Sequence, residues 1–145
     1  YQGITSNDIP KVTLGDGTEL RVIAGEFEGT QGPSSTFTPI NMYDINSRNG
    51  ENISLKLEDG TNTIILIMSG EIEMEDKTFQ EKSVLIFERE GEYCNFTVSN
   101  DFKGLILNGE PIDEPVVAYG PFVMNTMQEI REAMRDFQDG KMGRL

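Results

Sequence analysis

The residue types that carry out acid–base, nucleophilic or metal chemistry are unevenly represented in this chain of 145 residues. It contains no histidine and one cysteine, Cys94, against 25 aspartates and glutamates. A catalytic triad that depends on histidine is therefore excluded, and the imidazole that most often binds transition metals is missing. Cys94 with Glu58 would be an incomplete donor set for a buried metal, and we expect Cys94 to be a small apolar core residue. We predict no catalytic residue and no metal ligand in this chain.

Other patterns that carry chemistry are equally incomplete. Glu110 with Asp113 or Glu114 supplies carboxylates for general acid–base work, but nothing in the sequence places such a pair across a cleft. Residues 59–62 lack the alternating aspartates of a calcium loop and indicate a turn. The glycine-rich residues 25–32 lack the Lys-Ser/Thr ending of a phosphate loop. We therefore do not expect this chain alone to be catalytic.

Charge and hydropathy limit the classes of partner. A formal net charge of -13 would repel phosphate, so we expect no nucleic-acid partner. The longest apolar run, residues 64–68, is far too short to span a bilayer, so we expect no membrane partner. The acidic stretch from Glu71 to Glu92 indicates a solvated sheet face, with a docking surface for a basic partner as the alternative. Cys94 cannot form an internal disulfide and fits a reducing compartment, so we expect a cytoplasmic protein.

Short runs with strand character, separated by turns, occupy the first three quarters of the chain. Apolar residues at 53, 55 and 57 alternate with polar ones, the two-residue period of a half-buried strand. Residues 63–68 form a continuous strand-like run that predicts burial on both faces. The other strand-like runs are residues 20–24, 36–46, 71–75, 84–87, 94–98 and 105–107. Several short strands at close spacing predict an antiparallel sandwich or barrel rather than βαβ units.

The end of the chain predicts a helix. Thr126 and Glu129 form a capping-box pattern, in which each side chain reaches the backbone amide of the other residue. Apolar residues then recur at helical spacing from Met127 to Phe137, and Gly140 is placed to end the helix. We expect the apolar stripe of this helix to pack on the core of its own domain, with a neighbouring domain as the alternative.

Three blocks of sequence resemble one protein family. They are LRVIAGEFEGTQGP at residues 20–33 with SSTFTP at 34–39, LNGEPIDEPVVAYGPFVMNT at 107–126, and the ending FQDGKMG at 137–143. All three resemble the C-terminal domain of pirins, a family with two cupin domains that includes quercetin 2,3-dioxygenase-like proteins. The resemblance runs from about residue 9 to residue 143. It implies a mainly β fold, a cupin-type antiparallel β-barrel or jelly roll with one C-terminal α-helix.

The resemblance also implies a partner for this chain. In pirins an N-terminal cupin holds iron or a similar metal through three histidines and a glutamate, and nothing in this sequence corresponds to that domain. We therefore expect residues 1–145 to be one pirin C-terminal cupin-like domain, a fragment of a longer protein. Its expected partner is the N-terminal cupin domain or, failing that, a second copy of itself. The residues expected to act as interdomain contacts, or as a clasp on their own domain, are Tyr119, Pro121, Phe122, Met124 and Asn125.

The metal-ligand pattern of cupins can be laid directly on the sequence. The first half of the pattern, G-x5-H-x-H-x4-E-x6-G, fits the glycines at 50 and 70 and places its ligand positions at Lys56, Glu58 and Thr63. A shift of one residue would turn Leu55 and Leu57 inward instead, and the hydrophobic alternation favours that register. The second half of the pattern is G-x5-P-x-G-x2-H-x3-N. With Gly91 as its second glycine, Arg89 stands at its proline and Cys94 at its histidine, the third of the whole pattern. The spacing is retained, whereas the ligands are not.

Two functions follow as hypotheses. In the first, the chain is a metal-free cupin with a structural or interaction role, supporting a metal-bearing N-terminal cupin. The parent protein would then be a quercetin 2,3-dioxygenase-like oxidoreductase or a metal-dependent regulator, with iron or a similar metal only in its N-terminal domain. In the second, the chain is a stand-alone cupin that binds a small molecule in its barrel. An interior filled by side chains such as Ile53, Leu55, Leu57 and Phe96 would argue against the second hypothesis.

Overall fold

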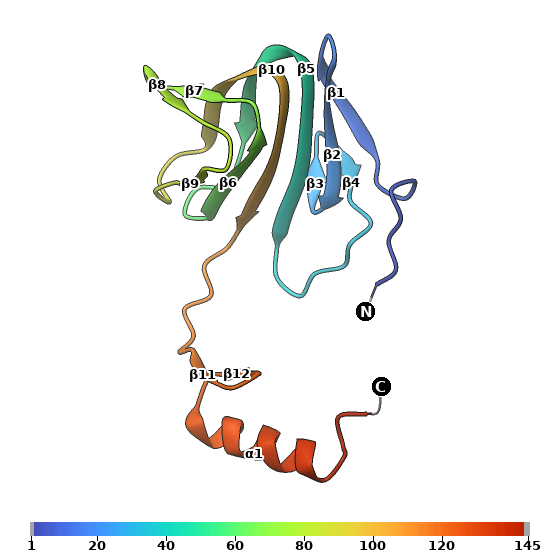
Figure 1. The fold of residues 1–145 in the computed structure, drawn as a ribbon, viewed down its shortest axis with the longest axis vertical. Coiled ribbons are helices and arrows are strands. Elements are labelled where there is room, and N and C mark those ends of the chain that lie inside the picture. Colours follow the sequence, from blue (N-terminus) through green and yellow to red (C-terminus); the bar gives the residue numbers. More distant parts are fainter. Residues whose placement is uncertain (1, 144–145) are drawn as a thin grey trace. The chain divides into compact units, whose positions relative to one another are not determined.

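The structure is a computed structural model that describes residues 2–143. The chain divides into two compact units, the first ending at Pro111 and the second beginning at Ile112. Strands make up almost all of the regular structure, and the described residues contain one α-helix (Figure 1). The prediction of a mainly β protein with one C-terminal helix is therefore confirmed. Within residues 2–143, no helix has the length and apolar character needed to cross a membrane.

The first unit is built around one antiparallel sheet in the order β1-β2-β5-β10-β6-β9, with β7 on β10 and β8 on β7. A separate small hairpin is formed by β3 and β4. The strands of this unit are β1 (Lys11–Gly15), β2 (Thr18–Ala24), β3 (Glu26–Phe27), β4 (Thr30–Gln31), β5 (Ile40–Lys56), β6 (Asn62–Ser69), β7 (Ile72–Met74), β8 (Lys77–Phe79), β9 (Val84–Ile86) and β10 (Tyr93–Gly109).

Two strands are much longer than the sequence patterns predict. Residues 36–46 and 53–57 were expected to be separate strands, but β5 runs without interruption from Ile40 to Lys56. It pairs with the equally long β10 from Ile40–Gly109 to Lys56–Tyr93. Each strand passes through one residue with positive φ, Gly50 at 73° and Asp101 at 55°. At Gly50 a Cβ would lie 3.0 Å from the carbonyl oxygen of Val98, so glycine lets the two strands stay paired there.

Alternate residues of these strands form the core of the first unit. The inward residues of β5 are apolar on both sides of Gly50, with Tyr43 and Ile45 before it and Ile53 and Leu55 after it, all at most 4% exposed. The fully or nearly buried side chains contributed by the other strands are Leu20, Val22, Ile65, Ile67, Ile72, Phe96, Val98, Phe102 and Ile106. The two-residue period predicted from the sequence therefore sets which side chains fill the interior.

The prediction that residues 63–68 are buried on both faces is wrong. Thr63, Ile65 and Ile67 point inward and are at most 5% exposed. On the opposite face of β6, Ile64 and Leu66 are only partly buried and Met68 is 47% exposed. An apolar run alone cannot distinguish a strand covered on both faces from one whose outer face stays open.

The second unit consists of a small hairpin and the helix. β11 (Val117–Tyr119) pairs with β12 (Phe122–Met124), and α1 spans Met127–Gln138. The capping box at Thr126 and Glu129 is present as predicted, and Ile130 and Ala133 are the buried residues of the helix. Beyond the helix, Gly140 has φ of 70° and its amide donates to the carbonyl of Phe137. Lys141 donates to the carbonyl of Asp136, which completes a Schellman-type ending.

Candidate functional site

The positions at which a cupin would hold a metal are the first candidate site. β5 and β10 place Leu55 directly across from Cys94. Leu55, Leu57, Thr63 and Cys94 point into the unit, each at most 9% exposed, whereas Lys56 and Glu58 are exposed. The register favoured by the hydrophobic alternation is therefore correct, and the register that turned Lys56 and Glu58 inward is wrong.

The space at these positions is small and its donors are weak. A cavity of about 40 Å³ is lined by Leu57, Thr63, Cys94 and neighbouring residues of the 87–93 turn. Burial raises the pKa of the Cys94 thiol to about 11, so at neutral pH the thiol is protonated in the absence of a metal. Among residues 2–143, no three His, Cys, Asp or Glu side chains are grouped so that they could hold a metal ion. The donor set present does not fit the metal that the cupin pattern implies.

A polar network closes the interior next to these positions. Asn108 is 4% exposed, and its Nδ2 donates to Thr61 Oγ1 at 2.7 Å and to Thr63 Oγ1 at 3.0 Å. Its Oδ1 accepts from Asn41 Nδ2 at 3.0 Å. Thr63, at which the pattern fitted to Gly50 and Gly70 has its glutamate, points inward, and its hydroxyl is bonded within the protein. No sequence motif indicates Asn108, which stands at an inward position of an alternating strand where an apolar residue is expected.

The interior of the first unit is filled by its own side chains. Ile53, Leu55, Leu57 and Phe96, which would have to leave room for a ligand in the barrel, are 4%, 0%, 9% and 5% exposed. Protein interiors packed in this way leave little space for a further molecule.

The outward face of the same sheet divides into a polar part and an apolar part. Residues directly across from one another on neighbouring strands form rows on this face. One row, from β1 to β9, consists of Lys11, Arg21, Asp44, Leu105, Leu66 and Val84. The next row reads Met42, Leu107, Ile64 and Ile86. We call the apolar members of these rows the apolar outer face: Met42, Ile64, Leu66, Val84, Ile86, Leu105 and Leu107. Val84 and Ile86 are 55% and 77% exposed.

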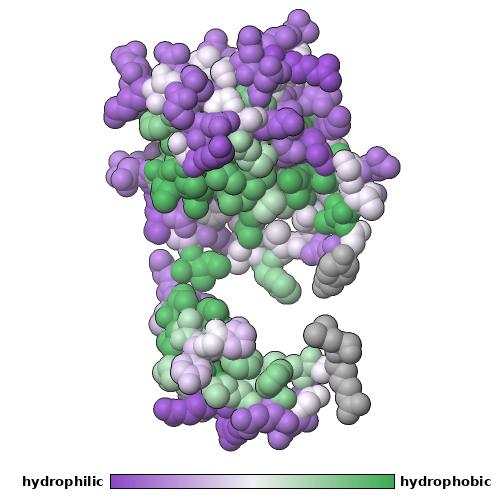
Figure 2. Space-filling model, in the orientation of Figure 1, coloured by the Kyte–Doolittle hydropathy of each residue, from purple (hydrophilic) through white to green (hydrophobic). Residues whose placement is uncertain are grey.

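The surface of the first unit also differs in hydropathy from one end to the other. On the first unit, Figure 2 shows hydrophobic residues gathered in a band, with hydrophilic residues toward the end that carries the β1–β2 and β7–β8 turns. Contiguous exposed apolar area of this kind marks interaction sites more often than chance exposure does. The apolar outer face is therefore the strongest candidate for a protein contact on this unit.

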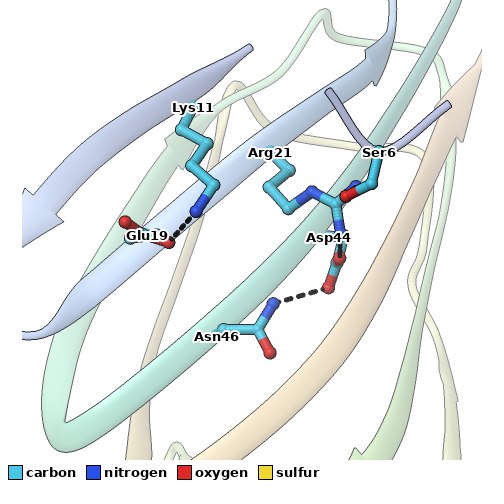
Figure 3. Close-up of polar contacts among 6 residues, drawn as sticks. All are labelled: Ser6, Lys11, Glu19, Arg21, Asp44 and Asn46. Atoms are coloured by element: carbon cyan, nitrogen blue, oxygen red, sulfur yellow. Dashed lines mark hydrogen bonds and ion pairs between the residues drawn. The ribbon is translucent and has the colours of Figure 1, made fainter. Parts of the chain in front are cut away.

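The polar part of the outward face forms a groove of about 890 Å³. Within it, Arg21 Nη1 donates to Asp44 Oδ2 at 3.2 Å and Nη2 donates to Ser6 Oγ at 3.2 Å (Figure 3). Lys11 Nζ donates to Glu19 Oε2 at 2.9 Å, and this hydrogen bond lowers the pKa of Glu19. We call this feature the basic groove, because four of its lining residues are cations: Lys11, Arg21, Arg48 and Lys103.

The acidic stretch and the predicted clasp residues lie elsewhere. Every carboxylate between Glu71 and Glu92 is exposed, as expected of a solvated face. In the second unit, the ring of Phe122 meets that of Phe137 edge to face at a centroid distance of 6.3 Å. Asn125 Nδ2 donates to Glu114 Oε2 at 2.8 Å and to the carbonyl of Pro115 at 2.9 Å. The contacts of Phe122 and Asn125 thus lie within the second unit, and their role as a clasp stays a prediction.

The other three predicted residues surround the turn of the hairpin. Tyr119 is 59% exposed, Pro121 is exposed and Met124 is half-buried. Gly120 at the first central position of the turn has φ of 55°, the sign that a type II′ turn requires. Their role in an interdomain contact stays a prediction.

Comparison with known proteins identifies relatives over nearly the whole chain. A family model for the pirin C-terminal cupin domain matches residues 42–143. A quercetin 2,3-dioxygenase-like protein of Pseudomonas aeruginosa is 37% identical over 142 residues, which cover 97% of this chain and 50% of the relative. Mouse pirin is 32% identical over 148 residues, which cover 99% of this chain and 51% of pirin.

A solved structure gives the same result for the fold. The crystal structure of a quercetin 2,3-dioxygenase from Acinetobacter baumannii superposes with a TM-score of 0.88 and 40% identity, covering 99% of this chain and 50% of that one. The cupin fold expected from the sequence blocks is therefore confirmed. The chain spans about half the length of the relatives it matches.

Proposed function

Because this chain belongs to the pirin C-terminal cupin domain family, we propose that it is the metal-free cupin of a two-cupin protein and supports a metal-bearing cupin. In this proposal its role is structural: it packs against the other cupin and shapes the mouth of that domain's metal site. The chemistry then belongs to the partner domain, and no reaction step is assigned to this chain.

One observation carries the proposal: the inward residues at or next to the cupin ligand positions are Leu55, Leu57, Thr63 and Cys94. Leucine side chains donate nothing to a metal, the Thr63 hydroxyl is bonded to Asn108, and Cys94 holds its proton at neutral pH. The same filled interior supports this role over that of a stand-alone cupin with a small molecule in its barrel.

The apolar outer face supports a role in packing. Burying its exposed side chains against another protein is favourable by about 25 cal/mol per Å² of apolar area removed from water. Since the chain spans about half of its relatives, a cupin from the other half of such a protein is the occupant that we propose. In the absence of that domain, a second copy would cover the face.

The activity of the whole protein is a further part of the proposal. Similarity to the Acinetobacter enzyme supports oxidation of a flavonoid-like substrate, and a metal-dependent regulatory protein is the alternative that the family resemblance implies. A free, buried cysteine suits a reducing compartment, and we place the protein in the cytoplasm.

Metal analysis tests the first half of the proposal. The purified chain is incubated with ferrous, nickel or zinc ions, passed through a desalting column and analysed by plasma mass spectrometry. We expect far less than one metal per chain, because no adequate donor set is present. One metal per chain that survives desalting would overturn the assignment.

Association with the other cupin tests the second half. The half of the Pseudomonas relative that the chain does not match is expressed separately and mixed with this chain, and light scattering measures the mass of the product. We expect a one-to-one complex that Val84→Glu/Ile86→Glu abolishes. Ser54→Glu/Gln80→Glu, which adds the same charge at exposed positions away from the apolar outer face, should leave it intact. Equal loss in both variants, or no complex at all, would contradict the packing role.

A further inference from the structure

The basic groove concentrates positive charge on a strongly acidic protein. The whole chain has 12 lysines and arginines against 25 aspartates and glutamates. The groove is lined by four of those cations and by two carboxylates, Glu19 and Asp101, and a third carboxylate, Asp44, is paired with Arg21 beside it. Its lining comes from β1, β2, β5, β6 and β10 and from the turns beside them, so the strand register fixes where these cations stand. The local charge therefore has the opposite sign to the charge of the molecule.

The four cations differ in how fully the protein uses them. Lys11 is paired with Glu19, and Arg21 is paired with Asp44. Arg48 and Lys103 are exposed and form no ion pair with any residue from 2 to 143. The Nε–H of Arg21 also has no acceptor within that part of the chain. The groove thus holds two cations that are free to bind an anion from outside.

Polar groups surround the two free cations. Lys103 stands directly across from Asn46 on β5 and from Ser69 on β6, and both line the groove. Asn46 is oriented by its own bond to Asp44, with Nδ2 donating to Oδ1 at 2.9 Å (Figure 3). The Asn46 amide and the Ser69 hydroxyl can bond to peptide groups, and the Arg48 and Lys103 side chains can bind carboxylates. Together they suit a ligand that carries both kinds of group.

We infer that the basic groove binds an acidic peptide segment of a partner protein, with carboxylates of that segment on Arg48 and Lys103. The groove already holds carboxylates at Lys11 and Arg21, so the geometry of its cations suits this group. A nucleic acid is disfavoured, because its closely spaced phosphates would meet the field of a chain with net charge of -13. A short acidic segment places its few charges only where the cations are.

The dependence of binding on salt follows from the positive charge within the groove and the negative charge of the rest of the chain. At about 0.15 M salt the Debye length is roughly 8 Å, so the peptide senses the local cations more than the distant carboxylates. At about 1 M salt the Debye length is roughly 3 Å, and the attraction of exposed cations is largely screened. We therefore expect binding at the lower of these two salt concentrations and its loss at the higher one.

A fluorescein-labelled octaglutamate peptide is the probe, and fluorescence anisotropy measures its dissociation constant with the whole chain. Arg48→Glu/Lys103→Glu should weaken binding at least about tenfold, equivalent to about 1.4 kcal/mol. Lys56→Glu/Lys77→Glu makes the same change of charge at exposed lysines outside the groove and should alter the constant less than about twofold. Thermal unfolding of both variants, each changed only at exposed positions, verifies that they are folded.

Three results would overturn the inference. They are no binding of the peptide by the unmodified chain at about 0.15 M salt, equal weakening by the two double variants, and binding of an eight-nucleotide oligothymidylate at least as tight as that of the peptide. Backbone amide shifts on adding the peptide give an independent result, since they should be largest at Asn46, Ser47 and Lys103. The inference is separate from the metal-free role proposed above, because neither the peptide nor the variants touch the inward ligand positions.

Discussion

Arg21 and Asp44 stand directly across from each other on β2 and β5, and their ion pair of 3.2 Å is largely shielded, with side chains 23% and 17% exposed. Lys11 and Glu19 form a second pair nearby, on β1 and β2, at 2.9 Å with side chains 56% and 49% exposed. Both are cation–carboxylate pairs between neighbouring strands, and they differ strongly in burial.

Removing one carboxylate from each pair should have unequal effects. Asp44→Ala leaves a half-buried guanidinium without its carboxylate, and we expect it to lower the free energy of unfolding by about 1–3 kcal/mol. Glu19→Ala removes an exposed partner and should cost less than about 1 kcal/mol. Urea unfolding followed by far-UV circular dichroism gives both values. Equal costs would show that burial of the Arg21–Asp44 pair does not matter.

Stability should fall at alkaline pH because two buried groups hold their protons. Burial raises the pKa of Cys94 from 9.0 to about 11 and that of Tyr43 from 10.0 to about 12, and nearby Glu26 adds to the Tyr43 shift. For groups with raised pKa values, the stabilisation is complete below the unfolded-state pKa and is lost as pH rises through the folded-state pKa. The loss should therefore run from about pH 9 to about pH 12.

Urea unfolding at a series of pH values across that window measures this loss. In Cys94→Ala the decline between about pH 9 and pH 11 should be shallower than in the unmodified chain. In Tyr43→Phe the decline of unfolding free energy should be shallower between about pH 10 and pH 12, about one pH unit above the range affected by Cys94→Ala. A decline of the same slope in all three proteins would mean that neither group causes it.

The two faces of the β6–β9 pair should respond differently to the same truncation. Ile65 on β6 is 1% exposed and Ile86 on β9 is 77% exposed. Ile65→Ala opens a cavity in the core and should cost about 2–5 kcal/mol, whereas Ile86→Ala should cost less than about 0.5 kcal/mol. Equilibrium unfolding of the two variants under one set of conditions makes the comparison. A large cost at Ile86 would place that side chain in a packed environment.

The network around Asn108 should tolerate no apolar replacement. Asn108→Leu leaves the side chains of Thr61, Thr63 and Asn41 without the bonds they form to it, and we expect a loss of about 1–3 kcal/mol in unfolding free energy. Asn95→Leu, at an exposed position of the same strand, is the matched control and should change stability by less than about 0.5 kcal/mol. Chemical denaturation again supplies both numbers, and similar losses would argue that the network is dispensable.

The helix of the second unit should depend on its cap. The Thr126 Oγ1 accepts from the Glu129 amide at 3.2 Å, and Glu129 Oε2 accepts from the Thr126 amide at 2.8 Å. Thr126→Ala removes the first bond and should destabilise the helix by about 1 kcal/mol, whereas Thr126→Ser keeps the bond and the stability. Hydrogen exchange at the Glu129 and Ile130 amides should be faster in the alanine variant only. Exchange that is unchanged by both substitutions would show that the cap does not hold the helix.

Local patterns predicted the features that local physics determines. Alternation at residues 53–57 indicated which side chains turn inward, and the capping box and Gly140 gave both ends of the helix. The continuity of β5 was not predictable in the same way. Its residues 46–52 are polar and contain Gly50, a composition typical of a loop, and they stay extended because β10 pairs with them.

The basic groove was beyond the reach of the sequence for a related reason. Lys11, Arg21, Arg48 and Lys103 belong to four different strands and share no spacing or motif. Only the register of β1, β2, β5 and β10 brings them to one face. The outward exposure of Ile64 and Leu66 was missed because an apolar run carries no information about which face a partner covers.

The pairing of β5 with β10 also determines when this unit can fold during synthesis. β10 is the strand that joins β5, β6 and β7, yet it is the last strand of the unit to be made. Until residues 93–109 leave the ribosome, β6 and β7 lack their main neighbour, and the edge of β5 that faces away from β2 is unpaired. Non-local pairing of this kind is slow, typically in the range of milliseconds to seconds for β-rich domains. Until β10 is made, the nascent chain therefore exposes unpaired strand edges, and chaperones protect intermediates of this kind from aggregation.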